Sequence, residues 1–316
     1  MKPFIIAEMS ANHNGSLERA FGIIEAASFA GADAIKFQTF DPEQMAVPGY
    51  TIPDGAWQGM DLVDLYKQAQ TPYEWHEELF RHARELDLIP MSSPFDALDV
   101  DFLENFNCPI YKIASYEMVD LRLITRAAET GKPLIMSTGM ASHDEILDAV
   151  VTAEEAGCQD ITLLHCVSEY PAPTSNINLH TMKDLEGFAW KVGLSDHTLG
   201  TSVSVAAVAL GATVIEKHIT LSKTGLDAGF SLDPGEFHKL VEDCNTAAEA
   251  LGRVRYGKGD SSLRRSLYYA QDIKAGTKID HHHIKTARPA LGMHPSKLNT
   301  LIGKTLARDV KENDPV

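Results

Sequence analysis

A chain of 316 residues with 44% hydrophobic and 23% charged residues can form one large globular domain, or a large and a small one, each with its own core. Its 28 Lys and Arg residues against 44 Asp and Glu residues give a net charge of −16, which excludes nucleic acids and anionic membranes as expected partners because like charges repel. We find no apolar run of about 18 residues and no signal peptide, and we therefore expect a cytoplasmic protein.

Short apolar runs alternate with amphipathic helical stretches along most of the chain. Several of the helical stretches open with Ser, Thr or Asp and close on Gly, as capped helices do. Eight strand–helix units within about 250 residues predict an α/β fold, the (β/α)8 TIM barrel. A doubly wound open sheet is the alternative, but no glycine-rich dinucleotide fingerprint follows the first run. The predicted strands are residues 4–9, 33–40, 88–95, 110–115, 133–139, 161–168, 189–197 and 213–220.

The composition changes near residue 253, where a polar, glycine-containing segment begins. We predict a catalytic barrel domain over 1–253, a linker over 254–261 and a small, mostly β domain over 262–316. The longest interruption of the barrel pattern is a loop over 38–64, and long loops on the active face of a barrel commonly cover substrate. In the small domain, the predicted β segments are 266–273, 283–288 and 305–310.

The four cysteines have neither paired nor metal-ligand spacing. We expect them to be reduced thiols that act as small core residues, as is usual in a reducing compartment. They are Cys108, Cys158, Cys166 and Cys244.

Polar residues stand at the end of every predicted strand. Barrel enzymes place their chemistry at the C-terminal ends of the strands. Charged residues inside apolar runs would also be costly to bury without partners or ligands. Together they predict an active site at this end of the barrel. The strand-end residues are Glu8, Asn12, His13, Lys36, Gln38, Ser92, Ser93, Lys112, Ser115, Ser137, Thr138, His165, Ser168, Ser195, Asp196, His197, Glu216, Lys217 and His218.

Two lysines and three serines of this set suggest an anion site. Lys36 and Lys112 would neutralise a phosphate and a carboxylate, and hydroxyl groups would donate hydrogen bonds to them. Either lysine could instead form an internal ion pair, or a Schiff base in an aldolase. The serines are Ser93, Ser115 and Ser137.

Two histidines follow neighbouring strands and suggest a metal site. His197 and His218 could bind a metal ion together with water and substrate oxygens. A strand-end histidine can equally be a hydrogen-bonded core or rim residue, so this pattern leaves both interpretations open. The run His281–His283 is expected to form a solvated turn without a ligand role.

Motifs in chain order resemble the bacterial sialic acid synthases. They are AEMSANHNGS, GADAIKFQTF, SSPFD, YKIAS, MSTGM, GLSDHTLG and IEKHITL. The tail SLYYAQDIKAGTKI and KTARPALGMHP resembles the C-terminal antifreeze-like (SAF) domain of that family. The resemblance implies a transferase that condenses phosphoenolpyruvate with an open-chain N-acetylated amino sugar to a nonulosonic acid. Phosphate would leave by C–O cleavage, and no organic cofactor would be needed.

The resemblance also implies roles for single residues. Glu8 matches a catalytic base or proton shuttle, and His197 and His218 match catalytic ligands of a divalent metal, usually manganese, with magnesium or cobalt as alternatives. Asp227 matches a sugar-binding acid. Arg288 matches an arginine that the SAF domain delivers to the other subunit of a domain-swapped homodimer. The remaining matches to substrate-binding positions are Lys36, Ser93 (usually Thr), Lys112, Ser115, Ser137, Ser168 (Asn in the sialate enzymes) and Ser195.

Within the family, the pair Ser10–Ala11 and the segments TPYEWHEELF, LDAGFSLDPGEF and GMHP look more like the pseudaminic acid synthase branch. That branch implies 2,4-diacetamido-2,4,6-trideoxy-L-altrose as the sugar. N-acetylneuraminate and legionaminate synthases are the alternatives. A Schiff-base aldolase and a non-catalytic sugar- or ice-binding protein are rival functions, although a binding module has no need of Glu8, two lysines and two histidines together.

Overall fold

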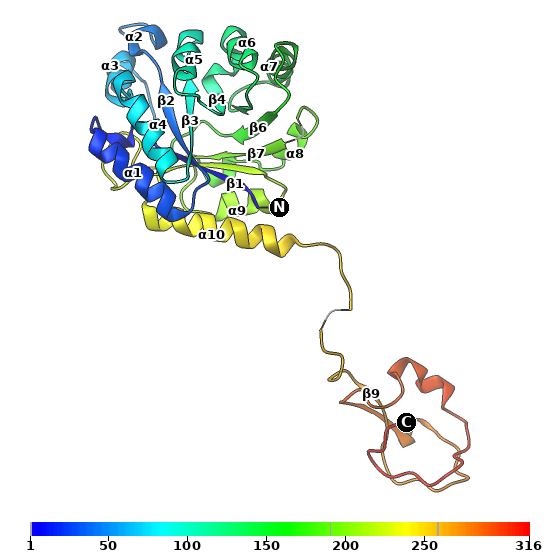
Figure 1. The fold of residues 1–316 in the computed structure, drawn as a ribbon. Helices are drawn as coiled ribbons and strands as arrows, with labels where there is room; N and C mark the ends of the chain where they lie inside the picture. The colour runs from blue at the N-terminus through cyan, green and yellow to red at the C-terminus, as the bar shows by residue number, and fades with distance from the viewer. Residues whose placement is uncertain (1, 190, 258) are drawn as a thin grey trace. The chain divides into compact units, whose positions relative to one another are not determined.

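The structure is a computed structural model that describes residues 2–189, 191–257 and 259–316, and it divides into two compact units, Met1–Gly252 and Arg253–Val316. The first unit is a closed barrel of eight parallel strands in chain order, surrounded by helices (Figure 1). The predicted (β/α)8 barrel is confirmed, and the doubly wound sheet is excluded because β1 pairs with β8. The strands are β1 (Phe4–Glu8), β2 (Ala34–Thr39), β3 (Ile89–Pro94), β4 (Tyr111–Ile113), β5 (Leu134–Ser137), β6 (Ile161–Cys166), β7 (Lys191–Asp196) and β8 (Val214–His218).

Each predicted strand contains an observed one and overestimates its length by at least one residue at one end. Trp190, inside the seventh predicted strand, lies outside the described residues. Side chains cap the helices as predicted. Ser16 caps the first helix, and Ser142 and Asp233 form capping boxes with the glutamates three residues later. The helices are α1 (Leu17–Ala30), α2 (Pro42–Met45), α3 (Leu62–Ala69), α4 (His76–Glu85), α5 (Ala97–Glu104), α6 (Leu121–Glu129), α7 (His143–Glu155), α8 (Thr181–Leu185), α9 (Ser202–Ala209) and α10 (Pro234–Leu251).

An apolar layer fills the barrel interior on the N-terminal side of the polar strand ends. It consists of Ile6, Ala34, Met91, Ile135, Leu164 and Val214, with Ile110 packed against it. Strand side chains alternate between the two faces, so the residues two positions further along the chain also point into the barrel. These are Glu8, Lys36, Ser93, Ser137, Cys166 and Glu216, with Lys112 two positions after Ile110. Apolar side chains therefore fill the barrel interior beneath its C-terminal end, and polar side chains line that end.

The predicted loop over 38–64 contains a short helix that the sequence did not predict. Asp41 caps α2 by accepting a hydrogen bond from the Glu43 amide, and Pro42 occupies its first turn. A single antiparallel bridge joins Thr51 to Asp61, just before α3 begins. The segment between α2 and α3 is thus a structured loop.

The second unit has its own small core and a two-stranded antiparallel sheet, β9 (Ser266–Tyr269) and β10 (Ile284–Ala287). The predicted β segment over 305–310 forms no strand and contributes only isolated bridges at Thr305 and Val310. This part of the prediction is wrong because single bridge residues, separated by turns, do not make a continuous ladder. His281–His283 forms a 3-10 turn in which two of the three side chains are exposed.

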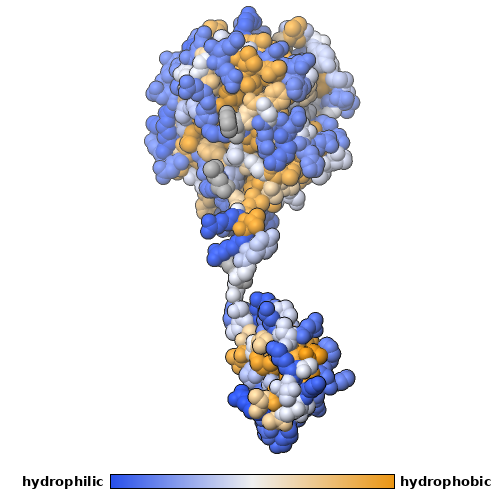
Figure 2. Space-filling model, turned by 90° about the vertical axis from the view of Figure 1, so that its right-hand side faces the viewer, coloured by the Kyte–Doolittle hydropathy of each residue, from blue (hydrophilic) through white to orange (hydrophobic). Residues whose placement is uncertain are grey.

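Hydrophilic residues cover much of the face that Figure 2 shows for each unit, with apolar residues interspersed. The apolar side chains of the barrel unit are instead concentrated between the strands and the surrounding helices. Among the described residues, no helix combines the length and apolar character needed to cross a membrane.

Candidate active site

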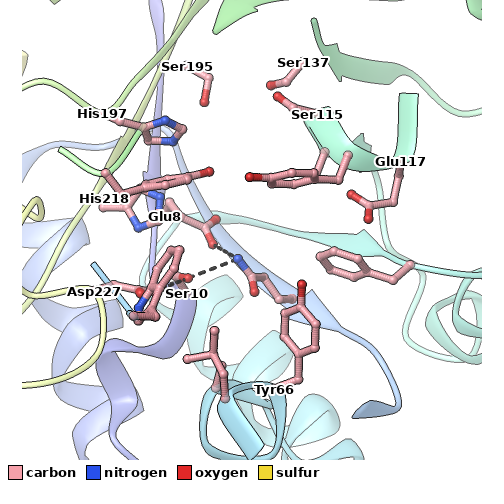
Figure 3. A pocket seen from close by; sticks show the side chains of 18 of the residues that line it. Glu8, Ser10, Tyr66, Ser115, Glu117, Ser137, Ser195, His197, His218 and Asp227 are labelled. Carbon is pink, nitrogen blue, oxygen red and sulfur yellow. Dashed lines mark hydrogen bonds between the residues drawn. The ribbon is translucent and has the colours of Figure 1, made fainter. Parts of the chain in front are cut away.

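A cavity of about 510 Å³ opens at the C-terminal ends of the barrel strands (Figure 3). The strand residues that line it are Glu8, Lys36, Gln38, Lys112, Ser137, Cys166, Ser195, Glu216 and His218. Loops add Ser10, Ser115, Glu117, Tyr170, His197, Asp227 and Phe230. The structured loop before α3 contributes Tyr50, Ile52, Pro53, Asp54 and Trp57. Polar strand ends and the long loop thus meet around one cavity.

Lys36 lies between two buried carboxylates at the base of this cavity. Its Nζ is 2.6 Å from Glu8 Oε2 and 3.8 Å from Glu216 Oε1, and it donates a hydrogen bond to Ser93 Oγ at 3.1 Å. Burial opposes the charge of Lys36, but Glu216 and Glu8 outweigh it and raise its pKa. Burial raises the pKa of Glu8 to about 7, although Lys36 acts to lower it. Glu8 is therefore poised to gain or lose a proton near neutral pH.

Lys112 has no such partner. Its Nζ donates to the backbone oxygen of Ile113 at 3.0 Å, and no carboxylate of the described residues lies within 4.0 Å of it. Burial lowers its pKa, although Glu216 acts in the opposite direction. A buried ammonium group without a bound counter-charge is the expected property of an anion site. Of the two interpretations left open for the lysines, Lys36 forms the internal ion pair and Lys112 does not.

Hydroxyl groups surround one end of the cavity near Lys112. Ser115 Oγ accepts a hydrogen bond from the amide of Gly139 at 3.2 Å, and Ser137 Oγ is buried without a partner among the described residues. A Cβ atom at position 139 would overlap Ser168 Oγ and would lie 2.8 Å from Ser115 Oγ. Glycine at this position therefore allows the hydroxyls of Ser115 and Ser168 to lie close to the backbone.

The two predicted metal ligands lie together on another side of the cavity. The ring centroids of His197 and His218 are 5.4 Å apart. His197 Nδ1 contacts the backbone oxygen of Val167 at 3.0 Å, which leaves Nε2 available to a ligand. His218 Nδ1 is buried and has no partner among the described residues, and burial lowers the pKa of His218 well below its ordinary value. A neutral imidazole with an unused nitrogen is what a metal ion requires.

No cluster of three or more His, Cys, Asp or Glu side chains suited to a metal ion occurs in the described ranges. A divalent ion held by the two imidazoles would have to take its remaining ligands from water and substrate oxygens.

A buried acid marks the side of the cavity next to β1. Asp227 Oδ2 accepts hydrogen bonds from Ser10 Oγ at 2.5 Å and from the amide of Ala11 at 3.1 Å. Asn12 donates to Ser231 Oγ at 2.9 Å, and Ser231 donates to the backbone oxygen of Asp227 at 2.6 Å. Burial raises the pKa of Asp227. The first motif of the chain thus holds Asp227 at the cavity.

Three aromatic rings form an apolar wall beside the histidines. The Phe230 ring centroid lies 5.0 Å from those of His218 and Tyr170. Trp57 packs 5.3 Å from Tyr170 and 6.2 Å from Phe230, and its indole N–H donates to the backbone oxygen of Leu226 at 3.2 Å. We call Trp57, Tyr170 and Phe230 the aromatic wall. It offers carbon-rich contacts next to the polar floor of the cavity.

Three of the predicted binding residues lie outside the cavity lining. Ser93 lies behind Lys36, which donates to it, so its contact with the cavity is indirect. Ser168 lies next to Cys166, whose Sγ is 4.0 Å from Ser168 Oγ. Arg288 is exposed directly after β10 in the second unit. The nine other predicted site residues all line the one cavity.

Several residues that line the cavity were not predicted from the sequence. Cys166 was expected to be a core residue, but it lines the cavity and its Sγ lies 3.9 Å from His197 Nδ1. The other three cysteines are buried as expected, and all four are free thiols. Glu117 follows Ser115 by two residues, and burial raises its pKa to about 7. The sequence could have indicated Glu117 as a cavity residue, because it closely follows the end of the fourth predicted strand.

Comparison with known proteins places this site in a family. The NeuB family model matches residues 23–256, and the SAF domain model matches residues 264–316. The pseudaminic acid synthase of Helicobacter pylori is 41% identical over 99% of this chain and 96% of its own length. The N,N'-diacetyllegionaminic acid synthase of Campylobacter jejuni is 37% identical over 99% of this chain and 98% of its own length.

A solved structure of a sialic acid synthetase is also similar to this chain. The N-acetylneuraminic acid (sialic acid) synthetase of Leptospira borgpetersenii is 32% identical, with a TM-score of 0.75 over 83% of this chain and 89% of that one. The predicted membership of the sialic acid synthase family and the predicted SAF domain are confirmed. With a barrel that presents this cavity and a family match over 23–256, the chain belongs to the NeuB family and carries a SAF domain.

Proposed function

We propose that the protein is a pseudaminic acid synthase, which condenses phosphoenolpyruvate with 2,4-diacetamido-2,4,6-trideoxy-L-altrose and releases phosphate. One observation carries this proposal: a single cavity combines the histidine pair and a buried acid with Lys112, which has no ion-pair partner in the part of the chain that the structure describes. The full-length identity of 41% to enzymes named pseudaminic acid synthase supports this choice among the sugars of the family.

The bond changes follow from the two substrates. Carbon 3 of phosphoenolpyruvate attacks the aldehyde carbon of the open-chain sugar, which forms the new C–C bond. Water adds to carbon 2, where positive charge develops, and the C–O bond to phosphate breaks. The water oxygen becomes the ketone oxygen at carbon 2, so water loses both of its protons. One proton ends on the former aldehyde oxygen, which becomes a hydroxyl group, and the other leaves with the phosphate. The site must therefore hold a trianionic substrate, polarise an aldehyde and move protons.

Lys112 and Lys36 supply the positive charge for the anionic substrate. Their ammonium groups, together with the hydroxyls of Ser115 and Ser137, can neutralise and orient phosphate and carboxylate oxygens. Glu8, whose pKa is raised to about 7 by burial, is suited to take up or release a proton at neutral pH. Ser195 donates to Glu216 Oε1 at 3.1 Å and holds that carboxylate beside Lys36. These groups accelerate the reaction by stabilising charge in fixed positions.

His197 and His218 would hold the divalent metal ion. When bound there, the ion supplies Lewis-acid polarisation of the sugar aldehyde. We infer manganese as the metal, with magnesium and cobalt as alternatives, from the family resemblance. The water and substrate oxygens expected beside the two imidazoles are donors that suit manganese and magnesium.

The sugar would extend from the histidines along Asp227 and the aromatic wall. Asp227 accepts hydrogen bonds, and the wall offers apolar contacts that suit acetamido methyl groups and a deoxy carbon. We further propose a domain-swapped homodimer in which Arg288 of the partner subunit completes the sugar site. This arrangement rests on the family resemblance. We also propose a cytoplasmic location, which agrees with the four free cysteines.

The proposal is tested by measuring phosphate release from phosphoenolpyruvate across a sugar panel. The panel contains N-acetylmannosamine and the open-chain-capable diacetamido derivatives with the altro and manno configurations. We expect the altro sugar to give the highest kcat/KM, and chelator to abolish activity that added manganese restores. Higher kcat/KM for another sugar would reassign the product, and activity that survives complete metal removal would contradict the proposed metal site.

The lowered pKa of Lys112 favours one rival, a Schiff-base aldolase. The same preparation therefore receives pyruvate and borohydride, and mass spectrometry searches for a stable adduct. We expect no adduct on Lys112, because its ammonium form is needed to bind the anion. An adduct formed together with metal-independent turnover would establish the aldolase instead.

Substitution of Gly139 tests the proposed role of the nearby serine hydroxyls in binding phosphoenolpyruvate. In Gly139→Ala the new methyl group overlaps Ser168 Oγ and crowds Ser115 Oγ, so both hydroxyls must shift, and Ser115 lines the cavity. We expect KM for phosphoenolpyruvate to rise about 10- to 100-fold, because displacements near 1 Å at a binding site have effects of this size. Gly235→Ala is the control, since its Cβ would meet its nearest neighbour at an ordinary 3.4 Å. Equal KM values for both variants would contradict a role of these hydroxyls in binding phosphoenolpyruvate.

A further inference from the structure

A buried ion pair lies on the outer face of β7 and β8, the strands at whose ends the two histidines stand. Lys217 Nζ is 3.0 Å from Asp196 Oδ2, and both side chains are 0% exposed. Neither residue lines the cavity. Asp196 directly precedes His197, and Lys217 directly precedes His218. The pair is therefore adjacent in sequence to both proposed metal ligands without contacting the substrate space.

The register of the barrel explains this arrangement. Asp196 of β7 and Lys217 of β8 are paired positions of the parallel ladder. Because side chains alternate along a strand, an outward-facing Asp196 and Lys217 turn the next residues, His197 and His218, inward. Joining the two outward side chains thus fixes the level at which the two histidines enter the cavity.

Further hydrogen bonds tie the pair to the following loop and helix. Asp196 Oδ1 accepts from the amide and from Oγ1 of Thr198, at 2.8 Å and 2.7 Å. Asp196 Oδ2 also accepts from Ser204 Oγ of α9 at 2.6 Å, and Lys217 Nζ donates to the backbone oxygen of Thr198. His197 is therefore held between two anchored residues, Asp196 before it and Thr198 after it.

Stability alone does not account for such a pair. Removing two charges from water is costly, and a well-packed apolar pair is often as stable or more stable. The pair also differs from the ion pair between Lys191 and Asp160 at the other end of β7, which is about half exposed. Because Asp196 and Lys217 are fully buried and directly precede the two histidines, their ion pair fixes the backbone positions from which both imidazole rings extend. Groups behind the ligands that fix their orientation commonly tune metal affinity.

We propose that Asp196 and Lys217 are positioning residues that set the spacing of His197 and His218 and thereby determine the affinity for the metal ion. This inference rests on the metal site of the proposed function. Its effect should appear in metal binding itself, apart from turnover, because neither side chain meets the substrate.

The test is a titration of the metal-free full-length protein with Mn²⁺, with free Mn²⁺ measured by electron paramagnetic resonance. The double variant Asp196→Asn/Lys217→Met removes both charges with little change in volume. We expect its Kd for Mn²⁺ to rise about 10- to 100-fold, the usual effect of changing an outer-shell partner. The Kd for phosphoenolpyruvate, measured by calorimetry without metal, should stay unchanged, and saturating Mn²⁺ should restore kcat.

The matched control is Lys191→Met/Asp160→Asn, which makes the same replacements in the exposed pair of the same strand. It should bind Mn²⁺ like the wild type. The inference is overturned if the double variant of the buried pair binds Mn²⁺ as tightly as the wild type. It is also overturned if the affinities for Mn²⁺ and phosphoenolpyruvate fall together, since that would indicate a general structural role.

If the double variant does not fold, Ser204→Ala decides the question. This change removes one hydrogen bond to Asp196 and leaves both charges in place. Weaker Mn²⁺ binding with unchanged phosphoenolpyruvate binding supports the inference, and wild-type Mn²⁺ binding overturns it. A wild-type protein that does not bind Mn²⁺ would overturn the proposed metal site as well. Failure of the inference and failure of the proposed function are thereby distinguished.

Discussion

Lys112→Met is expected to weaken phosphoenolpyruvate binding about 30- to 4000-fold while leaving the barrel at least as stable as the wild type. Truncating one partner of a buried charge pair costs roughly 2–5 kcal/mol of binding free energy, and each 1.4 kcal/mol is about a factor of ten. Lys112 has no carboxylate within 4.0 Å among the described residues, so its replacement removes a buried charge that no close ion pair balances. Calorimetry and thermal unfolding measure the two effects separately.

Lys36→Met is the matched comparison, because the same replacement is made at a lysine that has partners. It leaves Glu8 and Glu216 buried without their shared cation. Breaking a buried pair in this way typically costs about 3–5 kcal/mol of unfolding free energy. We therefore expect opposite stability effects from two lysines that both line the cavity. A Lys112→Met protein that is strongly destabilised, or that binds phosphoenolpyruvate normally, would contradict the assignment of Lys112 as the free cation of the anion site.

His218→Ala is expected to lower metal-dependent phosphate release by roughly 1000-fold or more, since Lewis-acid stabilisation is worth several kcal/mol and each 1.36 kcal/mol is a factor of ten. The fold should persist, because His218 Nδ1 has no hydrogen-bond partner to lose among the described residues. Mn²⁺ titration and the rate of phosphate release are the measurements.

His165→Ala is the control for this prediction. His165 is also buried at the end of a barrel strand, but its Nε2 bonds to the backbone oxygen of Ile177 and it does not line the cavity. We expect this variant to lose stability and to keep its Mn²⁺ affinity, the reverse of His218→Ala. If His218→Ala releases phosphate at the wild-type rate, the metal assignment is wrong.

The architecture could be predicted because its signals are local. The signals are short apolar runs, capped helices between them and polar residues at the strand ends, and each is contained in a short stretch of chain. The two-residue step from Ile6 to Glu8, or from Val214 to Glu216, already determines that these side chains share the barrel interior once the strand is known. The same reasoning failed for 305–310, where isolated bridge positions resemble a strand in sequence but form no ladder.

Several site residues could not be predicted because their exposure depends on distant parts of the chain. Cys166 has the sequence context of a core residue, and it reaches the cavity because its side chain is on the inward face of β6. Trp57 and Phe230 are 173 positions apart, and each alone is an ordinary apolar residue. They form one wall only because the loop before α3 and the segment after β8 meet at the same end of the barrel.

By itself the sequence determined the eight-stranded barrel, the presence of a small C-terminal domain, and the set of polar residues at the strand ends. It did not determine which of these residues pair with one another. Lys36 and Lys112 both lie in short apolar runs. Only the closed barrel places Glu8 and Glu216 on either side of Lys36 and leaves Lys112 with no carboxylate of the described residues within 4.0 Å. The reason is physical: strand patterns are local, whereas Coulomb energies and desolvation depend on distances that tertiary structure alone sets.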